Sequence, residues 1–372
     1  MGMRTIMTDA SEQLVDQVNT ALTNQTPLRI QGNNTKFALG RAEAEGEGEA
    51  EVISVSQHTG IVKYEPVELI LTARAGTTLA EIDQELKQHN QMLACDPRRY
   101  EGAATIAGSL ASNQSGSARP WAGSLRDHTL GIKLINGHGE HLQFGGQVLK
   151  NVAGYDVSRL QAGAMGTLGV ITEVSFKVLP KPAASITLVT EISAQSALQE
   201  MNRLARSPKP LTGASWVEGQ LYLRLQGAHS SVSATAQQWQ KESRAHVLNT
   251  ELAKSFWHKL REHQLDYFQQ RSTEVPLWRF SVNPGAEHFL SAENWAFDWA
   301  GAQRWLVGDF NAQILREYAA KAGGEVQMIA GGDRHGEVSF VPNTVLKQIH
   351  QNVKAALDPQ SIFNPGRLYS WL

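Results

Sequence analysis

The sequence predicts an α+β protein, and three observations carry that prediction. Before residue 180, short strand-like runs alternate with single helices, and Pro180 and Pro182 end the pattern. Between residues 102 and 169, glycine recurs where apolar runs end, which favours backbone that approaches a large ligand closely. After Ala183, strands and helices repeat in an order that suits an antiparallel sheet with helices on one face. We expect one domain at residues 1–183, a second at 184–340, and a C-terminal helix and tail at 341–372 that return to the first.

Composition narrows the function classes. The chain has 372 residues and a formal net charge of −2, so no polyanion partner such as a nucleic acid is indicated. It contains no apolar run of the ~18 residues that a membrane-spanning helix needs. We therefore expect a cytoplasmic protein.

The chain has a single cysteine, Cys95. It cannot form an internal disulfide, and an iron–sulfur cluster takes about four thiolates. We interpret Cys95 as a small buried hydrophobic residue, with a flavin-linked or reactive thiol as the alternative. If the protein handles electrons, it must use an organic cofactor and pass them to another chain.

In the first half, residues 11–22 have the apolar spacing of an amphipathic helix, with Ser11 as its cap. Residues 27–30 predict a strand, which enters the turn at 31–36. Consecutive amides in such a turn can form a nest for an anion, and Lys36 adds charge; an ordinary surface turn explains the residues equally well. The acidic run at 41–51 is interpreted as a solvated insertion without chemistry.

Further elements follow from periodicity and turn residues. We expect a helix from residue 76 to 86 and a hairpin turn at Asn136-Gly137. In the second half we expect strands at 185–192, 277–282 and 325–330, helices at 194–205, 231–242, 312–322 and 345–357, and hairpins around 218–219 and across 295–307.

Common nucleotide and metal motifs are absent from the sequence. The spacing Gly163-x-x-Gly166-x-x-Gly169 differs from the dinucleotide fingerprint and precedes a strand rather than a helix. No phosphate-loop, H-E-x-x-H or C-x-x-C pattern occurs. The residues alone predict a glycine-cradled cofactor site without naming the cofactor.

A set of motifs in a fixed order indicates which cofactor is bound. They are Gln-Gly-Asn-Asn-Thr (31–35), Asp-Pro (96–97), Ala-Thr-Ile-Ala-Gly-Ser (104–109), Ala-Ser-Asn (111–113), Gly-Ser-Leu-Arg-Asp (123–127), Lys-Asn-Val-Ala-Gly-Tyr-Asp (150–156), Gly-Thr-Leu-Gly-Val-Ile-Thr (166–172) and Phe-Asn-Pro-Gly-Arg (363–367). This order resembles FAD-binding proteins of the vanillyl-alcohol oxidase / p-cresol methylhydroxylase type. Within them it is most similar to the FAD-binding subunits of glycolate oxidases.

The resemblance implies a two-lobed FAD-binding domain of p-cresol methylhydroxylase type, followed by an α+β cap domain with an antiparallel sheet. The first turn and residues 105–109 would hold the pyrophosphate and flavin through backbone N–H groups, and Gly166, Val170 and Ile171 would flank the adenine end. The implied cofactor-binding residues are Gly32, Asn33, Asn34, Thr35, Pro97, Thr105, Ile106, Ala107, Gly108, Ser109, Gly123, Ser124, Asp127, Gly166, Val170 and Ile171.

The chain departs from the family pattern at several positions. Asn33 and Asn34 stand where the family has consecutive glycines, and Met165 stands where catalytic relatives have Glu. The histidine that attaches flavin covalently in some members has no counterpart, so we expect non-covalent FAD. No H-x-x-G-D-G-N-x-H metal segment is found, and His335 is interpreted as a surface-loop residue. Arg279 is either a carboxylate clamp or, more simply, a cap residue paired with Glu; catalytic residues stay unassigned.

The resemblance implies an FAD-binding subunit of a glycolate oxidase complex. It would oxidise glycolate, a small 2-hydroxy acid, to glyoxylate and pass electrons through flavin to a larger FAD-containing subunit and an iron–sulfur subunit. It would reach the inner face of the membrane only through these partners. The alternatives are a stand-alone FAD-dependent D-2-hydroxy-acid dehydrogenase and a non-redox scaffold subunit.

Overall fold

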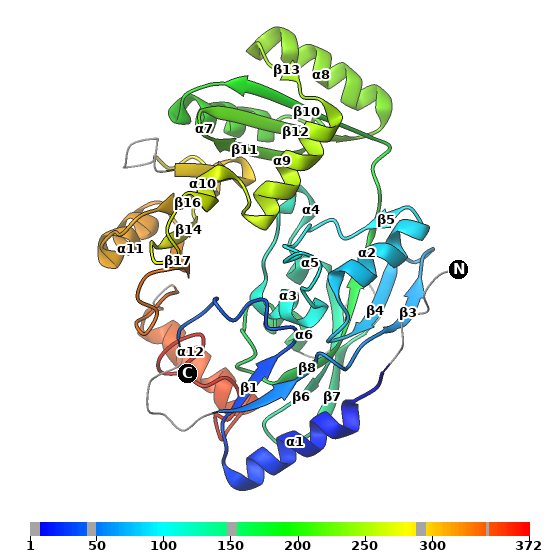
Figure 1. Cartoon of the computed structure of the whole chain (residues 1–372), viewed down its shortest axis with the longest axis vertical. Coiled ribbons are helices and arrows are strands. Elements are labelled where there is room, and N and C mark those ends of the chain that lie inside the picture. Colours follow the sequence, from blue (N-terminus) through cyan, green and yellow to red (C-terminus); the bar gives the residue numbers. More distant parts are fainter. Residues whose placement is uncertain (1–7, 43–49, 147–154, 288–294, 340–341) are drawn as a thin grey trace.

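The computed structural model describes residues 8–42, 50–146, 155–287, 295–339 and 342–372. Two large β-sheets, one of five strands and one of eight, form the centres of the two halves of the structure (Figure 1). Residues 150–154 of the motif at 150–156 lie outside the described residues, as do most of the acidic residues at 43–49.

The chain begins with a small lobe. Helix α1 (Ser11–Asn24) buries Leu14, Val18 and Ala21, the spacing that predicted it. Ser11 is its first helical residue and not its cap, because Ala10 occupies the cap position and makes no side-chain cap bond. Strands β1 (Leu28–Gln31) and β2 (Glu51–Ser54) pair in parallel beside it.

The second lobe is a five-stranded antiparallel sheet in the order β3-β4-β8-β6-β7. Leu71 and Ala73 of β4 face the hydrophobic core that α2 and α3 share, whereas the Thr72 hydroxyl points to the other face and bonds Ser175 at 2.8 Å. The elements of this lobe are β3 (Ile61–Glu65), β4 (Ile70–Arg74), α2 (Leu79–Gln88), β5 (Gln91–Met92), α3 (Ile106–Ser112), α4 (Arg119–Ala122), α5 (Leu125–His128), β6 (Thr129–Ile135), β7 (His141–Gly145), α6 (Val157–Leu160), β8 (Val170–Lys177) and β9 (Leu179–Pro180).

The hairpin between β6 and β7 differs in length from the one that the sequence predicts. The β6–β7 hairpin forms at the predicted place, but the Asn136 side chain organises it by accepting the N–H groups of His138 and Glu140. The two-residue turn that Asn136-Gly137 favours is therefore replaced by a longer one, in which Gly139 takes the positive φ.

The cap contains an eight-stranded antiparallel sheet in the order β13-β10-β12-β11-β15-β16-β14-β17. Its elements are β10 (Ala184–Glu191), α7 (Ala194–Ala205), β11 (Leu211–Val217), β12 (Gln220–Gly227), α8 (His229–Ser243), β13 (His246–Val247), α9 (Thr250–Glu262), α10 (Asp266–Gln269), β14 (Leu277–Ser281), β15 (Trp295–Asp298), η2 (Trp299–Gly301), β16 (Gln303–Val307), α11 (Ala312–Lys321) and β17 (Glu325–Ala330). The α+β prediction is confirmed, and so is the antiparallel sheet.

Helices cover both faces of the cap sheet, so the expectation of helices on one face is wrong. Trp295 and Phe297 of β15 pack with α7, α8 and α11, while the intervening Ala296 packs with α9 and α10. The α9 side also includes Leu39 from the first half of the chain. This face of the cap therefore looks toward the first two lobes (Figure 1).

The C-terminal segment returns to the first lobe, as expected. After α12 (Thr344–Leu357), Leu28 N–H donates to the carbonyl of Ile362, and Ile30 N–H donates to Asn364 Oδ1 at 2.8 Å. The division at residues 183 and 340 stays a prediction. No helix in the described ranges is long and apolar enough to cross a membrane.

A buried ion pair fastens this segment. Lys354 Nζ donates to Asp358 Oδ2 at 2.6 Å, to Thr167 O at 2.7 Å and to Phe363 O at 3.0 Å. Asp358 is fully buried and also accepts the N–H groups of Ile362 and Phe363.

We predict that Lys354→Met lowers the free energy of unfolding by about 3–5 kcal/mol, because it leaves the buried Asp358 carboxylate without its cation. Urea unfolding followed by circular dichroism measures the loss. Lys254→Met is the control: Lys254 forms an exposed pair with Glu251, and its loss should cost no more than ~0.5 kcal/mol. Equal losses in the two variants would contradict the assignment.

Candidate functional site

The turn after β1 presents a row of available backbone N–H groups. Among the described residues, the amides of 33–36 donate no hydrogen bond. Asn34 adopts a positive φ of 56°, which asparagine tolerates, and Asn33 Nδ2 anchors the turn by donating to Ala103 O at 2.9 Å. Successive free amides in such a turn form an anion-binding nest. Asn33 and Asn34 are exposed, so water can also accept from these amides, and the anion nest stays a prediction beside the ordinary surface turn.

Lys36 adds a positive charge beside this turn. Its Nζ lies 4.8 Å from the Tyr100 ring centroid and donates to Thr35 Oγ1 at 3.3 Å. No carboxylate of the described residues lies within 4.0 Å of it. Burial lowers the pKa of Lys36 to about 8; Arg98 lowers it further, and Glu262 opposes the shift. The ammonium group therefore lacks a protein counter-ion.

Residues 105–109 lie against this turn but do not offer free amides. A Cβ on Gly32 would come within 2.8 Å of Thr105 Oγ1, so the turn and the start of α3 touch. However, Ile106 N–H donates to Thr77 O, and Ala107 N–H donates to Ala75 O. The N–H groups of Gly108 and Ser109 are satisfied by Thr105. The expectation that this segment holds a pyrophosphate through its amides is therefore not supported by its hydrogen bonds.

The turn containing Gly166 joins the same region. Gly166 has a φ of 75°, and a Cβ there would lie 2.6 Å from Asn364 Nδ2, so glycine is needed. Asn364 Nδ2 donates to Met165 O at 2.7 Å, while its Oδ1 accepts from Ile30. The C-terminal Asn-Pro-Gly motif thus ties β1 to this turn.

The remaining predicted residues lie apart from the first turn. Asp127 accepts hydrogen bonds from the Ser124 N–H and hydroxyl at 2.8 Å each, so its carboxylate caps α5; Gly123 precedes that cap. Pro97 is buried in the loop that meets α9. Val170 and Ile171 are buried in β8. Their roles toward a cofactor stay predictions.

Several buried polar atoms of side chains have no hydrogen-bond partner in the described part of the chain. They include Asn113 Oδ1, Ser115 Oγ and both amide atoms of Gln161. Asn113 and Ser115 belong to the loop at 113–118, which follows α3. Buried polar atoms are normally paired, so Asn113 and Ser115, two residues apart in this loop, are candidates for contact with a ligand or with water.

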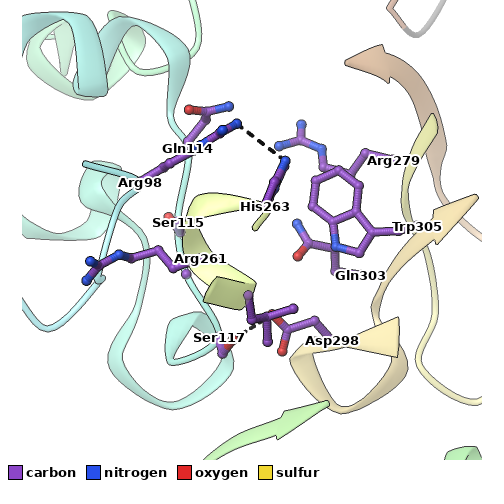
Figure 2. Close-up of a pocket in the computed structure, with 12 residues that line it drawn as sticks. Arg98, Gln114, Ser115, Ser117, Arg261, His263, Arg279, Asp298, Gln303 and Trp305 are labelled. Carbon is purple, nitrogen blue, oxygen red and sulfur yellow. Dashed lines mark hydrogen bonds between the residues drawn. The ribbon is translucent and has the colours of Figure 1, made fainter. Parts of the chain in front are cut away.

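The same loop forms one wall of a cavity between the lobes and the cap (Figure 2). The opposite wall comes from the end of α9 and from cap strands. The lining residues are Arg98, Gln114, Ser115, Gly116, Ser117, Leu260, Arg261, His263, Arg279, Asp298, Gln303 and Trp305. Except for Arg279, these residues gave no sequence signal, because they come from separate elements.

His263 lies at the centre of this cavity. It caps α9 with a φ of 58°, and its ring stacks on Phe268 at 4.6 Å. Burial and the nearby arginines hold its pKa well below the ordinary value. Its Nδ1 lies 3.4 Å from an Arg98 nitrogen, which can only donate, so Nδ1 accepts and Nε2 carries the proton.

Arg279 extends from β14 into the same cavity. Its Nη2 donates to Gln327 Oε1 at 2.8 Å, and no carboxylate in the described ranges lies within 4.0 Å. Arg279 therefore forms no direct ion pair with Glu among the described residues, although the charge of Glu325 acts on it from a longer distance. His335 is exposed, and the described residues contain no group of three His, Cys, Asp or Glu side chains that could hold a metal.

Cys95 is buried, as predicted, and burial raises the pKa of its thiol to about 12.

A left-handed turn of the cap holds the 113–118 loop. Trp299, Ala300 and Gly301 all have positive φ. Trp299 Nε1 donates to Gly116 O at 2.9 Å, and Asp298 Oδ2 accepts from Ser117 Oγ at 2.7 Å. Burial raises the pKa of Asp298 to about 6. Strained backbone of this kind persists where the surroundings enforce it.

These features fit a dinucleotide such as FAD. The free amides at 33–36 and the unmatched Lys36 suit a pyrophosphate. The unsatisfied atoms of Asn113, Ser115 and Gln161 suit further polar groups of a ligand. The donor set is therefore that of an elongated, anionic, polar molecule.

Comparison with known proteins also indicates FAD as the cofactor. A family model described as FAD binding domain matches residues 5–145. Glycolate oxidase subunit GlcE of Escherichia coli K12 is 42% identical over 365 residues, covering 98% of this chain and 99% of that protein. Glycolate oxidase subunit GlcD of Bacillus subtilis 168 is 28% identical over 178 residues, 47% of this chain and 37% of that protein. Among solved structures, an alkyldihydroxyacetonephosphate synthase shares the fold, with a TM-score of 0.67 and 14% identity over 96% of this chain and 76% of that chain. The end-to-end match at 42% identity shows the family: this chain belongs to the GlcE family of glycolate oxidase subunits.

Proposed function

We propose that the protein is the FAD-binding subunit of a glycolate oxidase complex, in which glycolate is oxidised to glyoxylate and electrons leave through flavin to partner subunits. One observation carries the proposal: four consecutive backbone amides at 33–36 without a protein acceptor lie beside the partly buried Lys36, which has no carboxylate of the described residues within 4.0 Å, in a chain of the GlcE family.

The chain's own residues bind and orient the cofactor. The amides of 33–36 and Lys36 hold the pyrophosphate, and Asn113, Ser115 and Gln161 offer polar atoms to the remainder. Gly166, Val170 and Ile171 stay our candidates for the adenine end. When bound, FAD supplies the electron-accepting chemistry. We expect it to be dissociable, because the sequence lacks the histidine that attaches flavin covalently in some relatives.

Electrons must leave through other chains. A single buried cysteine cannot hold an iron–sulfur cluster, which takes about four thiolates. We therefore propose a larger FAD-containing subunit and an iron–sulfur subunit as partners, which would bring this chain to the inner face of the membrane. Whether this chain oxidises substrate by itself is a second candidate function, favoured by the cavity that contains Arg279 and His263.

The first prediction from this function concerns the binding of FAD and the rate of glycolate oxidation. The purified chain should bind FAD that denaturation releases fully into the supernatant. Glycolate oxidation with a dye acceptor should be negligible until the larger flavoprotein and the iron–sulfur protein are added. Absorption spectra and dye reduction measure both properties. Flavin that stays on the denatured polypeptide, or substantial activity of the isolated chain, would contradict the corresponding part.

A second prediction uses the charge of Lys36. The pKa of about 8 applies to the FAD-free protein, so Lys36 is charged below that pH. In this range its charge contributes its full share to the affinity for the pyrophosphate. Above it, binding must first protonate Lys36, and FAD affinity should fall as pH rises from about 7 to about 9. Isothermal titration at each pH measures the fall.

Variants of Lys36 separate its charge from other titrations. Lys36→Met should bind FAD about tenfold more weakly near neutral pH and lose the dependence on pH. Lys36→Arg stays charged and should keep its affinity at the higher pH. Tyr100, Arg98 and Glu262 also face Lys36, so a pH dependence that persists in both variants would assign the effect to them and refute the role of Lys36.

A third prediction tests whether the cap positions the cofactor loop. Trp299→Phe keeps an aromatic ring beneath Arg119 but removes the N–H that donates to Gly116 O. We expect an altered visible flavin spectrum and weaker FAD binding. Trp216→Phe is the matched control, because it removes an N–H bonded to Ile192 O at 2.8 Å, away from the 113–118 loop. Indistinguishable spectra of the two FAD-loaded variants would refute the positioning role.

A further inference from the structure

We propose that the cavity between the lobes and the cap binds the carboxylate of a small organic acid through Arg279 and His263, so that this subunit itself holds a substrate or product. The identity of the acid as a 2-hydroxy or 2-oxo acid rests on the proposed function. The carboxylate-binding property rests on the cavity alone.

The charge of Arg279 is the first observation. The cavity's other guanidinium groups have acidic neighbours: Arg261 donates to Asp96 at 2.8 Å and to Glu262 at 2.7 Å, and Arg98 lies 4.0 Å from Glu262. Arg279 instead has the neutral Gln327 as its partner. Burial lowers the pKa of Arg279, and Glu325, which lies beyond 4.0 Å, opposes this shift; a guanidinium keeps its charge in proteins. A carboxylate is the ligand that matches a guanidinium left with free donors.

Gln327 orients the guanidinium group of Arg279 without neutralising its charge. Its Nε2 donates to Ser339 Oγ at 3.1 Å, which directs its Oε1 toward Arg279. The guanidinium is therefore held in place while its charge stays available.

His263 is the second observation. Its neutral ring presents Nε2–H without adding a fourth positive charge beside Arg98, Arg271 and Arg279, which all lower its pKa. Stacking on Phe268 and an edge contact with Trp305 fix the orientation of the ring. A fixed neutral donor near an unmatched cation is a suitable arrangement for the second oxygen of a carboxylate.

The opposite end of the cavity contains a carboxyl group, which determines how a bound acid is oriented. Asp298 lies there with Ser117, away from His263 and Arg279 (Figure 2). A bound carboxylate is repelled by an ionised Asp298 and attracted by Arg279. The carboxylate should therefore lie at the Arg279 end and the rest of a small acid should point toward the 113–118 loop.

Oxalate is a suitable probe, because it is small, anionic and not oxidised in place of the substrate. Isothermal titration of the FAD-loaded full chain should give saturable binding, with a change in the visible flavin spectrum. Neutral oxamide, of similar size, should not bind. Arg279→Gln should weaken oxalate binding at least tenfold, and Arg279→Lys should weaken it less.

Arg203→Gln is the matched control, since Arg203 is an exposed arginine of α7 paired with Glu200. Its oxalate affinity should equal that of the wild type. FAD content, measured on every variant, separates the two proposals: a chain without FAD refutes the proposed function, whereas oxalate titration of that same chain still tests the cavity. Absence of saturable binding, equal binding of oxamide, or unchanged affinity in Arg279→Gln would overturn the inference. Should Arg279→Gln not fold, the comparison of oxalate with oxamide on the wild type decides.

Discussion

The proposed anion site depends on the turn at the end of β1, where four backbone amides without a protein acceptor lie beside the partly buried ammonium group of Lys36. Water satisfies these donors when no ligand is bound, and an anion that replaces this water would be held by the amides and the charge together. Three contacts keep the turn in this state: Gly32 lies against Thr105, Asn33 bonds Ala103, and Asn364 bonds both β1 and the turn at Met165. The C-terminal segment, held by Lys354 and Asp358, therefore supports β1 and the turn at Met165 through Asn364.

The other end of the binding region is built by the cap. The left-handed turn at Trp299 holds the 113–118 loop through Gly116 and Ser117, and the end of α9 meets the loop that follows Cys95. Glu262 accepts the backbone N–H groups of Arg99 and Tyr100, which places His263 directly over the cavity. The turn at 33–36 thus belongs to the first lobe, whereas the cavity is lined by residues of both the 113–118 loop and the cap.

Departures from the family pattern have local physical explanations. Asn34 has a positive φ, so it takes the conformation for which relatives use glycine. Met165 also has a positive φ, and its carbonyl accepts the Asn364 amide, so its backbone supports the site while its side chain packs beside the cap core. Both residues thus take a left-handed backbone conformation.

Local features of the sequence determined the α+β class, the helix at 194–205, the strand at 325–330 and the turn at 218–219, because periodicity and turn preference act over a few residues. They also located the turn at 31–36 and the Asn-Pro-Gly clasp. Only the tertiary structure decided which groups are free: it paired the amides of Ile106 and Ala107 with Thr77 and Ala75, gave Arg279 a glutamine instead of a glutamate, and placed α9 on the inner face of the cap. Such partners come from distant segments, as with Asp96 and Arg261, which are 165 residues apart, so no local pattern specifies them.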